Sequence, residues 1–384
     1  MPTIGLYTAT ENELGAVGRA AAEVDADLIV RSESDLDGPE DADAFVDELT
    51  DATVVVLWLH GAEDSMPGYG HAVERLREAG VPLVVKATGD AFAIEDTSVD
   101  GDTRERVCDY LDRGGTANVA NCIRYLVDRF GDETREYDDP VPLPTEGVYH
   151  PDHPGASYEE LAATLDPDTP TVGVWFYESH WTHENLRYVD AQVRAIESQG
   201  ADALPVFCNP AEDDPDQHDA EWVVDNWLTD ETGDPIVDAM LSSFMFSLSM
   251  DERGRSADDE GGGDVFLDRL GVPVIQTVTT MRSRSRYDSS DTGVMGFELA
   301  LSVALPEFDG NVITHPISGK ERTDDEAGIG TAPKQHFPIE DRVSHAASLA
   351  VNWARLRHTQ NADKQVAVVL HNYPPSDDGI GTAF

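Results

Sequence analysis

The sequence is poor in cysteine and has no long apolar segment. Its three cysteines, Cys108, Cys122 and Cys208, include no close pair, so the sequence predicts neither a disulfide framework nor a cysteine metal site. No apolar run approaches the ~18 residues of a membrane-spanning helix. The first residues also lack the charged and apolar stretches of a signal peptide. We therefore expect a cytoplasmic protein that does not enter a membrane.

Positive charge is scarce, and lysine is scarcer still. The 384 residues carry 26 lysines and arginines against 75 aspartates and glutamates, for a net charge of -49, and only four of the 26 are lysine. Such a surface cannot replace the counterions of a nucleic acid, and anionic lipid repels it. Acidic groups this dense also repel one another at low salt, whereas molar salt screens them. We therefore hypothesise adaptation to a high-salt cytoplasm; the alternative is an acidic protein from ordinary salt.

The glycine-rich motifs that bind nucleotide phosphates are missing. Gly319-Lys320 is followed by glutamate and lacks the upstream glycine of a P-loop. The Gly-x-Gly pairs at 68–70 and 328–330 lack the third glycine and the strand-to-helix setting of a dinucleotide-binding loop. This chain therefore has no visible means of binding ATP or NAD itself.

Short apolar runs alternate with helical patterns, which predicts a parallel α/β fold. Residues 54–59 form a continuous apolar run, as in a strand that is covered on both faces. Apolar residues at helical spacing over 116–130 predict an amphipathic helix. A second series of strands and helices begins at 171–176. Because strands joined by helices form parallel sheets with right-handed crossovers, we expect successive parallel-sheet domains.

A proline-rich stretch separates the two series. Residues 139–154 contain five prolines, which excludes an ordinary helix or a central strand. The chain is therefore predicted to have four parts. These are an N-terminal α/β domain over 1–137, an ordered inter-domain crossing over 138–170, a second α/β domain over 171–362, and the first strand of a further, truncated domain over 363–384.

Two histidines follow the first predicted strand of the second domain. His180 and His183 lie in the segment 179–184, directly after the strand at 171–177. Ligands of open α/β sheets bind at the carboxyl ends of the strands, where this segment is expected to lie. The two side chains could share a metal ion, or one could bind the metal while the other transfers protons. The alternative is polar capping of the next helix.

Three arginines fall within five residues. Arg282, Arg284 and Arg286 follow a predicted strand, and in an extended chain their alternation puts all three on one face. A row of guanidinium groups suits a ligand with several carboxylates. The alternative is that these arginines pair with neighbouring acids of the same protein.

Glu307 lies in a short acidic turn after a predicted helix. Its carboxylate could accept a proton or hold a cation, although such a turn is usually structural. This residue enters the set of candidate catalytic groups together with His180.

Several segments resemble, in their order along the chain, the large subunit of cobaltochelatase and its relative, the large subunit of magnesium chelatase. The matching segments are 147–151, 176–180, 200–207, 237–239, 270–276, 304–310, 369–375 and 379–381. The Asn-Tyr-Pro-Pro sequence at 372–375 favours the cobalt branch. Family members are much longer, so this chain resembles an N-terminal portion, from truncation or a split gene. The family usually has acidic or neutral residues at 282–286, so the resemblance assigns no role to the arginines there.

The resemblance implies an enzyme that inserts Co²⁺ into hydrogenobyrinic acid a,c-diamide during cobalamin biosynthesis. It implies successive domains of a Rossmann-like or periplasmic-binding-like kind, as in the chelatases. The large subunit of such an enzyme holds the macrocycle and the metal. Separate AAA+ ATPase subunits, CobS/CobT-like or ChlI/ChlD-like, bind ATP and Mg²⁺, which is consistent with the missing P-loop. The fragment alone is expected to be inactive.

Metal insertion needs a base for the pyrrole protons and ligands that take cobalt from water. We therefore expect His180 to handle the metal or accept a proton, with Glu307 as the carboxylate base. The metal set is His180 and His183. The substrate-binding set is Arg282, Arg284, Arg286, Tyr149 and His150, of which the last two lie in the first matching segment.

Other functions remain open at this point. The first is the large subunit of a magnesium chelatase that acts on protoporphyrin IX. The second is a two-lobed module that binds a tetrapyrrole without catalysis. An unrelated sugar or metabolite binder is the least favoured, because the matching segments occur in order along the chain.

Overall fold

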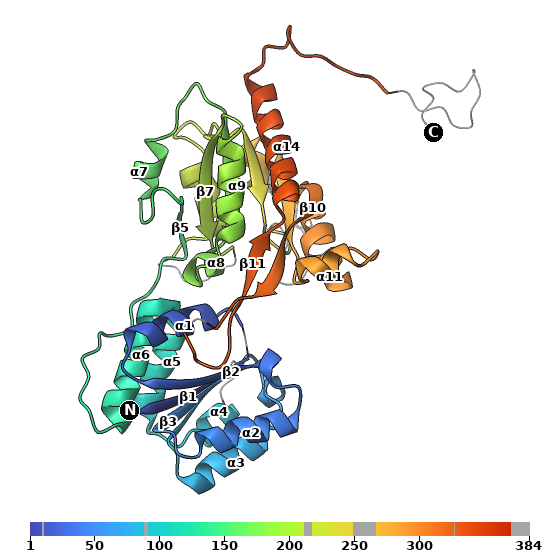
Figure 1. Ribbon diagram of the computed structural model, residues 1–384. Coiled ribbons are helices and arrows are strands. Elements are labelled where there is room, and N and C mark those ends of the chain that lie inside the picture. The colour runs from blue at the N-terminus through green and yellow to red at the C-terminus, as the bar shows by residue number, and fades with distance from the viewer. Residues whose placement is uncertain (10, 88–90, 211–216, 249–265, 326, 370–384) are drawn as a thin grey trace.

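The computed structural model describes residues 1–9, 11–87, 91–210, 217–248, 266–325 and 327–369. These residues form two α/β units, each built on a sheet whose strands are mainly parallel (Figure 1). The prediction of an α/β fold with successive parallel sheets is therefore confirmed. None of the helices within these ranges is long and apolar enough to cross a membrane.

The N-terminal unit has a four-stranded parallel sheet in the order β2-β1-β3-β4. The predicted apolar run forms β3, and all five of its residues are buried. Helices α1, α5 and α6 pack on one face of the sheet, and α2 and α3 pack on the other. The elements are β1 (Thr3–Thr8), α1 (Leu14–Glu23), β2 (Asp27–Ser32), η1 (Glu33–Asp35), α2 (Pro39–Leu49), β3 (Val54–Trp58), η2 (Glu63–Ser65), α3 (Tyr69–Ala79), β4 (Leu83–Lys86), α4 (Ala91–Asp96), α5 (Gly101–Arg113) and α6 (Gly115–Phe130).

The second unit has a seven-stranded sheet in the order β11-β10-β9-β8-β6-β7-β5. Its five inner strands are parallel, and the two edge strands are antiparallel to their neighbours. The strands are β5 (Glu146–Val148), β6 (Thr171–Tyr177), β7 (Asp202–Cys208), β8 (Ala239–Ser242), β9 (Val274–Thr279), β10 (Val312–Arg322) and β11 (Lys334–Pro338).

Helices cover both faces of this second sheet. Core residues of α9 and α14 pack on one face, and those of α10, η3 and η5 pack on the other. The helical elements are α7 (Tyr158–Ala162), α8 (Glu178–Thr182), α9 (Arg187–Glu197), α10 (Ala220–Val223), η3 (Val224–Leu228), η5 (Phe266–Leu270), α11 (Arg284–Asp288), α12 (Gly296–Leu299), η6 (Ala300–Ala304), α13 (Leu305–Phe308) and α14 (Glu340–His358).

The proline-rich crossing is part of the second sheet, and the last predicted strand is not formed in its described residues. Within the crossing, β5 pairs with β7 and completes the second sheet, and Val148 is buried. The strand expected from residue 365 is not formed over 365–369, because this stretch is exposed and pairs with no strand of the described chain. The rest of that predicted strand, and the Asn-Tyr-Pro-Pro sequence, lie outside the described residues.

A hairpin loop joins the two units. Between β10 and β11, residues 323–325 and 327–333, which we call the strap, reach back to the N-terminal unit (Figure 1). Ile329 of the strap is buried in the N-terminal core. Its carbonyl oxygen accepts a hydrogen bond of 3.0 Å from the backbone N–H of Val30 in β2. The second unit thus contributes a residue to the core of the first.

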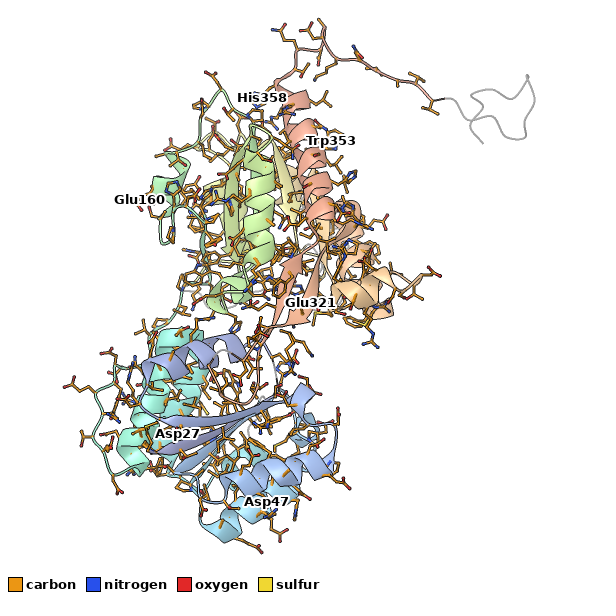
Figure 2. All side chains as sticks on the ribbon, viewed as in Figure 1. Asp27, Asp47, Glu160, Glu321, Trp353 and His358 are labelled. Carbon is orange, nitrogen blue, oxygen red and sulfur yellow. The ribbon has the colours of Figure 1, made fainter. Side chains whose placement is uncertain are left out.

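Acidic side chains project from the surfaces of both units. Asp27, Asp47 and Glu160, labelled in Figure 2, are exposed examples from β2, α2 and α7. The negative charge is therefore a property of the whole surface and not of one tail.

Candidate functional site

The carboxyl ends of strands from both sheets face one seam between the two units. A hollow of about 270 Å³, which we call the β3–α8 hollow, lies there. Its N-terminal side includes Trp58, His60 and Lys86, at or just after the ends of β3 and β4, and its other side includes Glu178 and His183 around α8. Ligands of parallel α/β sheets bind at such carboxyl ends. The predicted position of the histidine segment is therefore confirmed.

Two more hollows continue along the seam. The larger, of about 610 Å³, lies between α1, the start of α9 and the strap, and we call it the arginine hollow. A narrow space of about 10 Å³ separates it from the β3–α8 hollow. This space shares Ser179 and His183 with one neighbour and Gly15, Pro333 and Gln335 with the other. The three hollows therefore form one band, with the histidines near its middle.

His180 is held inside the seam by a hydrogen bond. Its Nδ1 atom lies 2.6 Å from the hydroxyl oxygen of Tyr188, and its ring centroid lies 5.6 Å from that of His336. Burial, and then the charge of Lys320, lowers the pKa of His180 to about 3. The imidazole is therefore neutral at pH 7, which suits a metal ligand better than a group that keeps an accepted proton.

His183 has an unsatisfied ring nitrogen. Its Nδ1 atom is buried and has no hydrogen-bond partner within the described residues. Burial, and then the charge of Arg19, lowers its pKa to about 4, so this ring is also neutral at pH 7. Helix α1 packs closely here, since a Cβ on Gly15 would lie 3.2 Å from the carbonyl oxygen of His183. The seam thus holds two neutral imidazoles.

The two histidines do not form a complete metal site by themselves. Over the described residues, the one group of three or more potential ligands within 4.8 Å of one another is His150, Asp152 and Glu197. Neither His180 nor His183 belongs to it. A metal ion bound by the two seam histidines would therefore need further ligands from the substrate or from another part of the protein.

His336 and Lys320 lie close to His180, and no sequence pattern predicted this. His336 is buried on β11, its backbone N–H donates to Asn185 at 2.8 Å, and its Nδ1 atom lies 3.2 Å from the hydroxyl of Ser318. Burial lowers the pKa of His336 well below its usual value, and burial also lowers the pKa of Lys320. The pairing of β10 with β11 brings these side chains to residues more than a hundred positions earlier in the chain.

His150 lies where the crossing meets α9, away from the linings of the seam hollows. Its Nδ1 atom accepts a hydrogen bond of 3.2 Å from the backbone N–H of Asp152. Its Nε2 atom therefore carries the hydrogen and donates to Glu197 at 3.0 Å, which leaves no lone pair for a metal ion. Both Asp152 carboxylate oxygens are bound by Arg194, each at 2.5 Å. The cluster of His150, Asp152 and Glu197 is thus a closed network.

Tyr149, like His150, contacts α9. Its hydroxyl donates to the carboxylate of Asp190 on α9 at 2.6 Å. Tyr149 and His150 therefore fasten the edge of the second sheet to α9, and neither lines a seam hollow.

The prediction of an extended arginine row is wrong. Residues 284–288 form the helix α11, because the Ser283 side chain caps its first turn, so Arg282, Arg284 and Arg286 cannot alternate along one strand. The Nε atom of Arg284 lies 2.5 Å from Asp288, as the alternative of pairing with neighbouring acids predicted.

Arg282 and Arg286 lie in different local surroundings. Arg282 donates to the Thr292 hydroxyl at 3.3 Å, and Arg286 is exposed. Glu307, the predicted base, is exposed on α13 and lines none of the three seam hollows. Neither Glu307 nor any of the three arginines lines a seam hollow.

The sequence model of the family described as CobN/Magnesium Chelatase matches residues 108–384. The chain belongs to this family. The match begins inside α5 and includes the whole second unit, with α8, the strap and β11. The family resemblance predicted from the ordered segments is therefore confirmed.

Relatives of this family member come from both metal branches. An uncharacterized protein of Methanocaldococcus jannaschii is 33% identical over 298 residues, which are 76% of this chain and 24% of that protein. The aerobic cobaltochelatase subunit CobN of Pseudomonas aeruginosa is 28% identical over 88% of this chain and 26% of its own length. The H subunit of the magnesium chelatase of Rhodobacter capsulatus is 26% identical over 70% of this chain and 23% of its own length.

A solved structure has the same fold. The catalytic subunit of cobaltochelatase from Mycobacterium tuberculosis matches all of this chain and 29% of that chain, with a TM-score of 0.71 and 26% sequence identity. The family member described here thus spans about a quarter of the length of the relatives that it matches.

Proposed function

We propose that this chain is part of the large subunit of an ATP-dependent tetrapyrrole metal chelatase, and that the seam binds the metal-free macrocycle. The observation that carries the proposal is a pair of neutral histidines between two hollows, in a member of the CobN/magnesium chelatase family. Both rings stay neutral at pH 7. The Nδ1 atom of His183 has no hydrogen-bond partner in the described residues, and the Nε2 atom of His180 keeps a lone pair in the tautomer whose Nδ1–H donates to Tyr188. These nitrogens suit a borderline metal ion such as Co²⁺.

The N–H protons of the macrocycle, one in a corrin and two in a porphyrin, must leave as the metal enters. Glu178 lines the β3–α8 hollow as the first residue of α8, and its carboxylate accepts a hydrogen bond from Thr182. We assign proton acceptance to Glu178 before Glu307, because Glu307 lies outside the hollows. Two further carboxylates line the same hollow from the opposite unit: Glu13, and Asp112, which pairs with Lys86. The metal loses water ligands as His180 or His183 replaces them.

The energy for insertion comes, in this proposal, from separate AAA+ ATPase subunits that bind ATP and Mg²⁺. The missing P-loop supports this division, because this chain has no glycine-rich loop of its own for the phosphates. Co²⁺ is the proposed substrate metal, and hydrogenobyrinic acid a,c-diamide is the proposed macrocycle in cobalamin biosynthesis. A cytoplasmic location follows from the same proposal.

Magnesium insertion into protoporphyrin IX is the second candidate, since the H subunit of a magnesium chelatase matches this chain nearly as well as a CobN subunit does. A single titration tests both. The chain is mixed with each metal-free macrocycle in molar KCl, and quenching of tryptophan fluorescence measures binding. We expect the corrinoid to bind more tightly than protoporphyrin IX. Tighter binding of protoporphyrin IX would favour the magnesium branch, and no binding of either would contradict the proposed function.

A further inference from the structure

Three arginines from distant parts of the sequence meet around the arginine hollow. Arg19 comes from α1, Arg187 is the first residue of α9, and Arg322 ends β10. The other charged residues of the lining are Asp324 and Asp325. The lining therefore has a net positive charge, on a chain whose net charge is -49.

Arg187 is the cation with most freedom to bind a ligand. Its guanidinium carbon lies 4.5 Å from the ring centroid of Phe337, a distance at which the cation and the ring attract one another. No carboxylate within the described residues forms an ion pair with it. The contact with Phe337 holds the guanidinium over the ring and leaves its N–H groups for an anion.

Arg19 also has unused hydrogen-bonding capacity. Its Nε atom is occupied, since it lies 3.0 Å from Glu184 and 2.9 Å from the Thr116 hydroxyl. Its Nη2 atom is buried and has no hydrogen-bond partner in the described part of the chain. Glu184 has a φ of 53°, a left-handed conformation that non-glycine residues rarely adopt. The acid thus pairs with the Nε atom of Arg19, and the Nη2 atom has no acceptor in the described residues.

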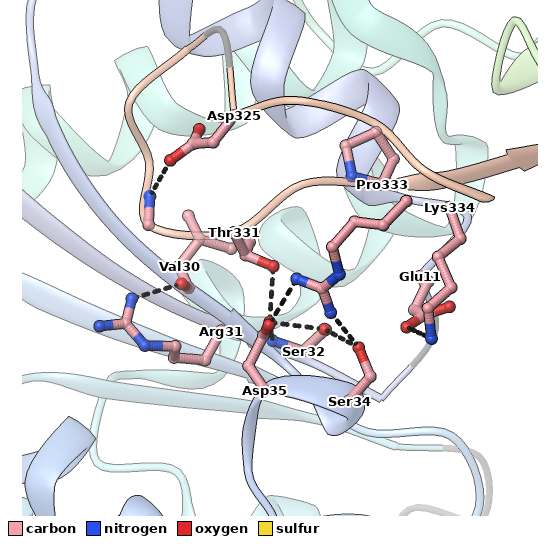
Figure 3. Close-up of polar contacts among 12 residues, drawn as sticks. Glu11, Val30, Arg31, Ser32, Ser34, Asp35, Asp325, Thr331, Pro333 and Lys334 are labelled. Carbon is pink, nitrogen blue, oxygen red and sulfur yellow. Dashed lines mark hydrogen bonds and ion pairs between the residues drawn. The ribbon is translucent and has the colours of Figure 1, made fainter.

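The acids around Arg322 are already engaged, and one of them pairs with Arg322 itself. Asp325 accepts hydrogen bonds from the backbone N–H groups of Ile329 at 3.0 Å and Gly330 at 2.9 Å, which fold the strap (Figure 3). Arg322 itself lies 2.7 Å from Asp35. Arg322 is therefore a weaker anchor for a ligand than Arg187, and it positions the wall of the hollow.

The rest of the lining mixes apolar and polar residues. Leu14 and Ile329 are buried beside the hollow, and Gly15 and Gly18 present no side chain on this face of α1. A volume of about 610 Å³ is within the range of small-molecule sites. Apolar residues and guanidinium groups in one lining suit a ligand with an apolar body and several carboxylates.

We propose that the arginine hollow anchors the peripheral carboxylates of the tetrapyrrole, with Arg187 as the main contact and Arg19 as the second. This inference rests on the proposed function, because it identifies where the proposed substrate is held. The narrow space with His180 and His183 adjoins the hollow. A macrocycle anchored by its side chains at Arg187 is thus directed toward the neutral imidazoles.

The test uses the complete 384-residue chain and metal-free uroporphyrin, a tetrapyrrole whose peripheral side chains all end in carboxylates. Fluorescence titration in molar KCl compares the wild type with Arg187→Gln, Arg187→Lys and Arg129→Gln. Arg129 is the matched control, because it is an arginine on α6 that pairs with Asp100 and lines none of the three hollows. Melting curves verify that each variant is folded.

Loss of a charge-assisted hydrogen bond to the ligand raises the dissociation constant about tenfold. We expect Arg187→Gln to weaken uroporphyrin binding about tenfold, Arg187→Lys to weaken it less, and Arg129→Gln to leave it unchanged. Equal affinity of the wild type and Arg187→Gln would overturn the inference and leave the proposed function standing. Absence of uroporphyrin binding by the folded wild type would also overturn the inference, whereas the proposed function is decided by the titrations with the corrinoid and protoporphyrin IX.

Discussion

The Nδ1 atom of His180 lies 2.6 Å from the hydroxyl oxygen of Tyr188, within the seam between the two α/β units. Burial lowers the pKa of His180 to about 3 and that of His183 to about 4, and it lowers the pKa of His336 well below its usual value. The folded protein therefore holds three imidazoles neutral, whereas in the unfolded chain they titrate near pH ~6.5.

Stability should consequently fall as the pH decreases from 7 to 5. A histidine whose folded pKa is lowered binds more protons in the unfolded state, so its contribution is lost as the pH falls from the unfolded pKa toward the folded one. Denaturant titrations at pH 7 and pH 5 measure this loss, which is at most about 1.4 kcal/mol per pH unit for each histidine. His183→Gln should have a smaller loss than the wild type. The exposed His71, which lies 3.5 Å from Asp43, gives the control variant His71→Gln. An unchanged pH dependence in His183→Gln would contradict the prediction.

Asp35 should stabilise the attachment of the strap. Its carboxylate accepts hydrogen bonds from Ser32, from Thr331 at 2.5 Å and from Arg322 at 2.7 Å (Figure 3). These bonds hold its pKa below the usual value although burial acts in the opposite direction. We expect Asp35→Asn to lower the free energy of unfolding by about 1–3 kcal/mol, since buried donors lose a charged acceptor. Chemical denaturation measures the change, and the exposed Asp37→Asn is the control. Equal losses in the two variants would rule out a special role of Asp35.

Glu178 should matter for metal insertion more than Glu307. In the complete chelatase with its ATPase subunits, Glu178→Gln should lower the rate of insertion by about 10²-fold or more, as loss of a general base does. Glu307→Gln should have little effect, because this exposed residue lies outside the seam hollows. The absorbance change of the macrocycle on metal binding follows the rate. The opposite ranking would return the catalytic role to Glu307.

Thermal stability should rise with salt. The net charge of -49 repels itself across the surface, and the Debye length falls from about 10 Å at 0.1 M to about 3 Å at 1 M salt. We expect the melting temperature to increase from low to molar KCl and to change much less with an uncharged osmolyte such as sucrose. A melting temperature that stays constant in KCl would remove the hypothesis of adaptation to high salt.

The fold could be predicted from local patterns, whereas the composition of the seam could not. The apolar run of β3 and the helical spacing in α6 are signals within a few residues, and both elements formed where expected. His180 and His183 were found because they follow β6 directly. Arg19, Arg187 and Arg322 come together only through the packing of the two units, and no pattern in the sequence connects them.

The positions of the arginine row and of His150 also have identifiable physical reasons. Arg282, Arg284 and Arg286 alternate as in a strand, but the Ser283 cap starts a helix between the first and second arginine. His150 lies in a segment that the family resemblance marked, yet the pairing of β5 with β7 brings that segment to α9 and Glu197. The first reason is a local helix cap, whereas the second is a tertiary contact that short-range spacing could not predict.

The strap makes the two units dependent on each other. A protein cut at residue 137 would leave the N-terminal half with an open place in its core where Ile329 belongs, and it would leave the other half with an exposed isoleucine on a free hairpin. The boundary seen in the sequence therefore does not separate two independently folding pieces. A recombination or gene fusion at residue 137 would be tolerated only if β2 and the strap that contacts it came from the same parent protein.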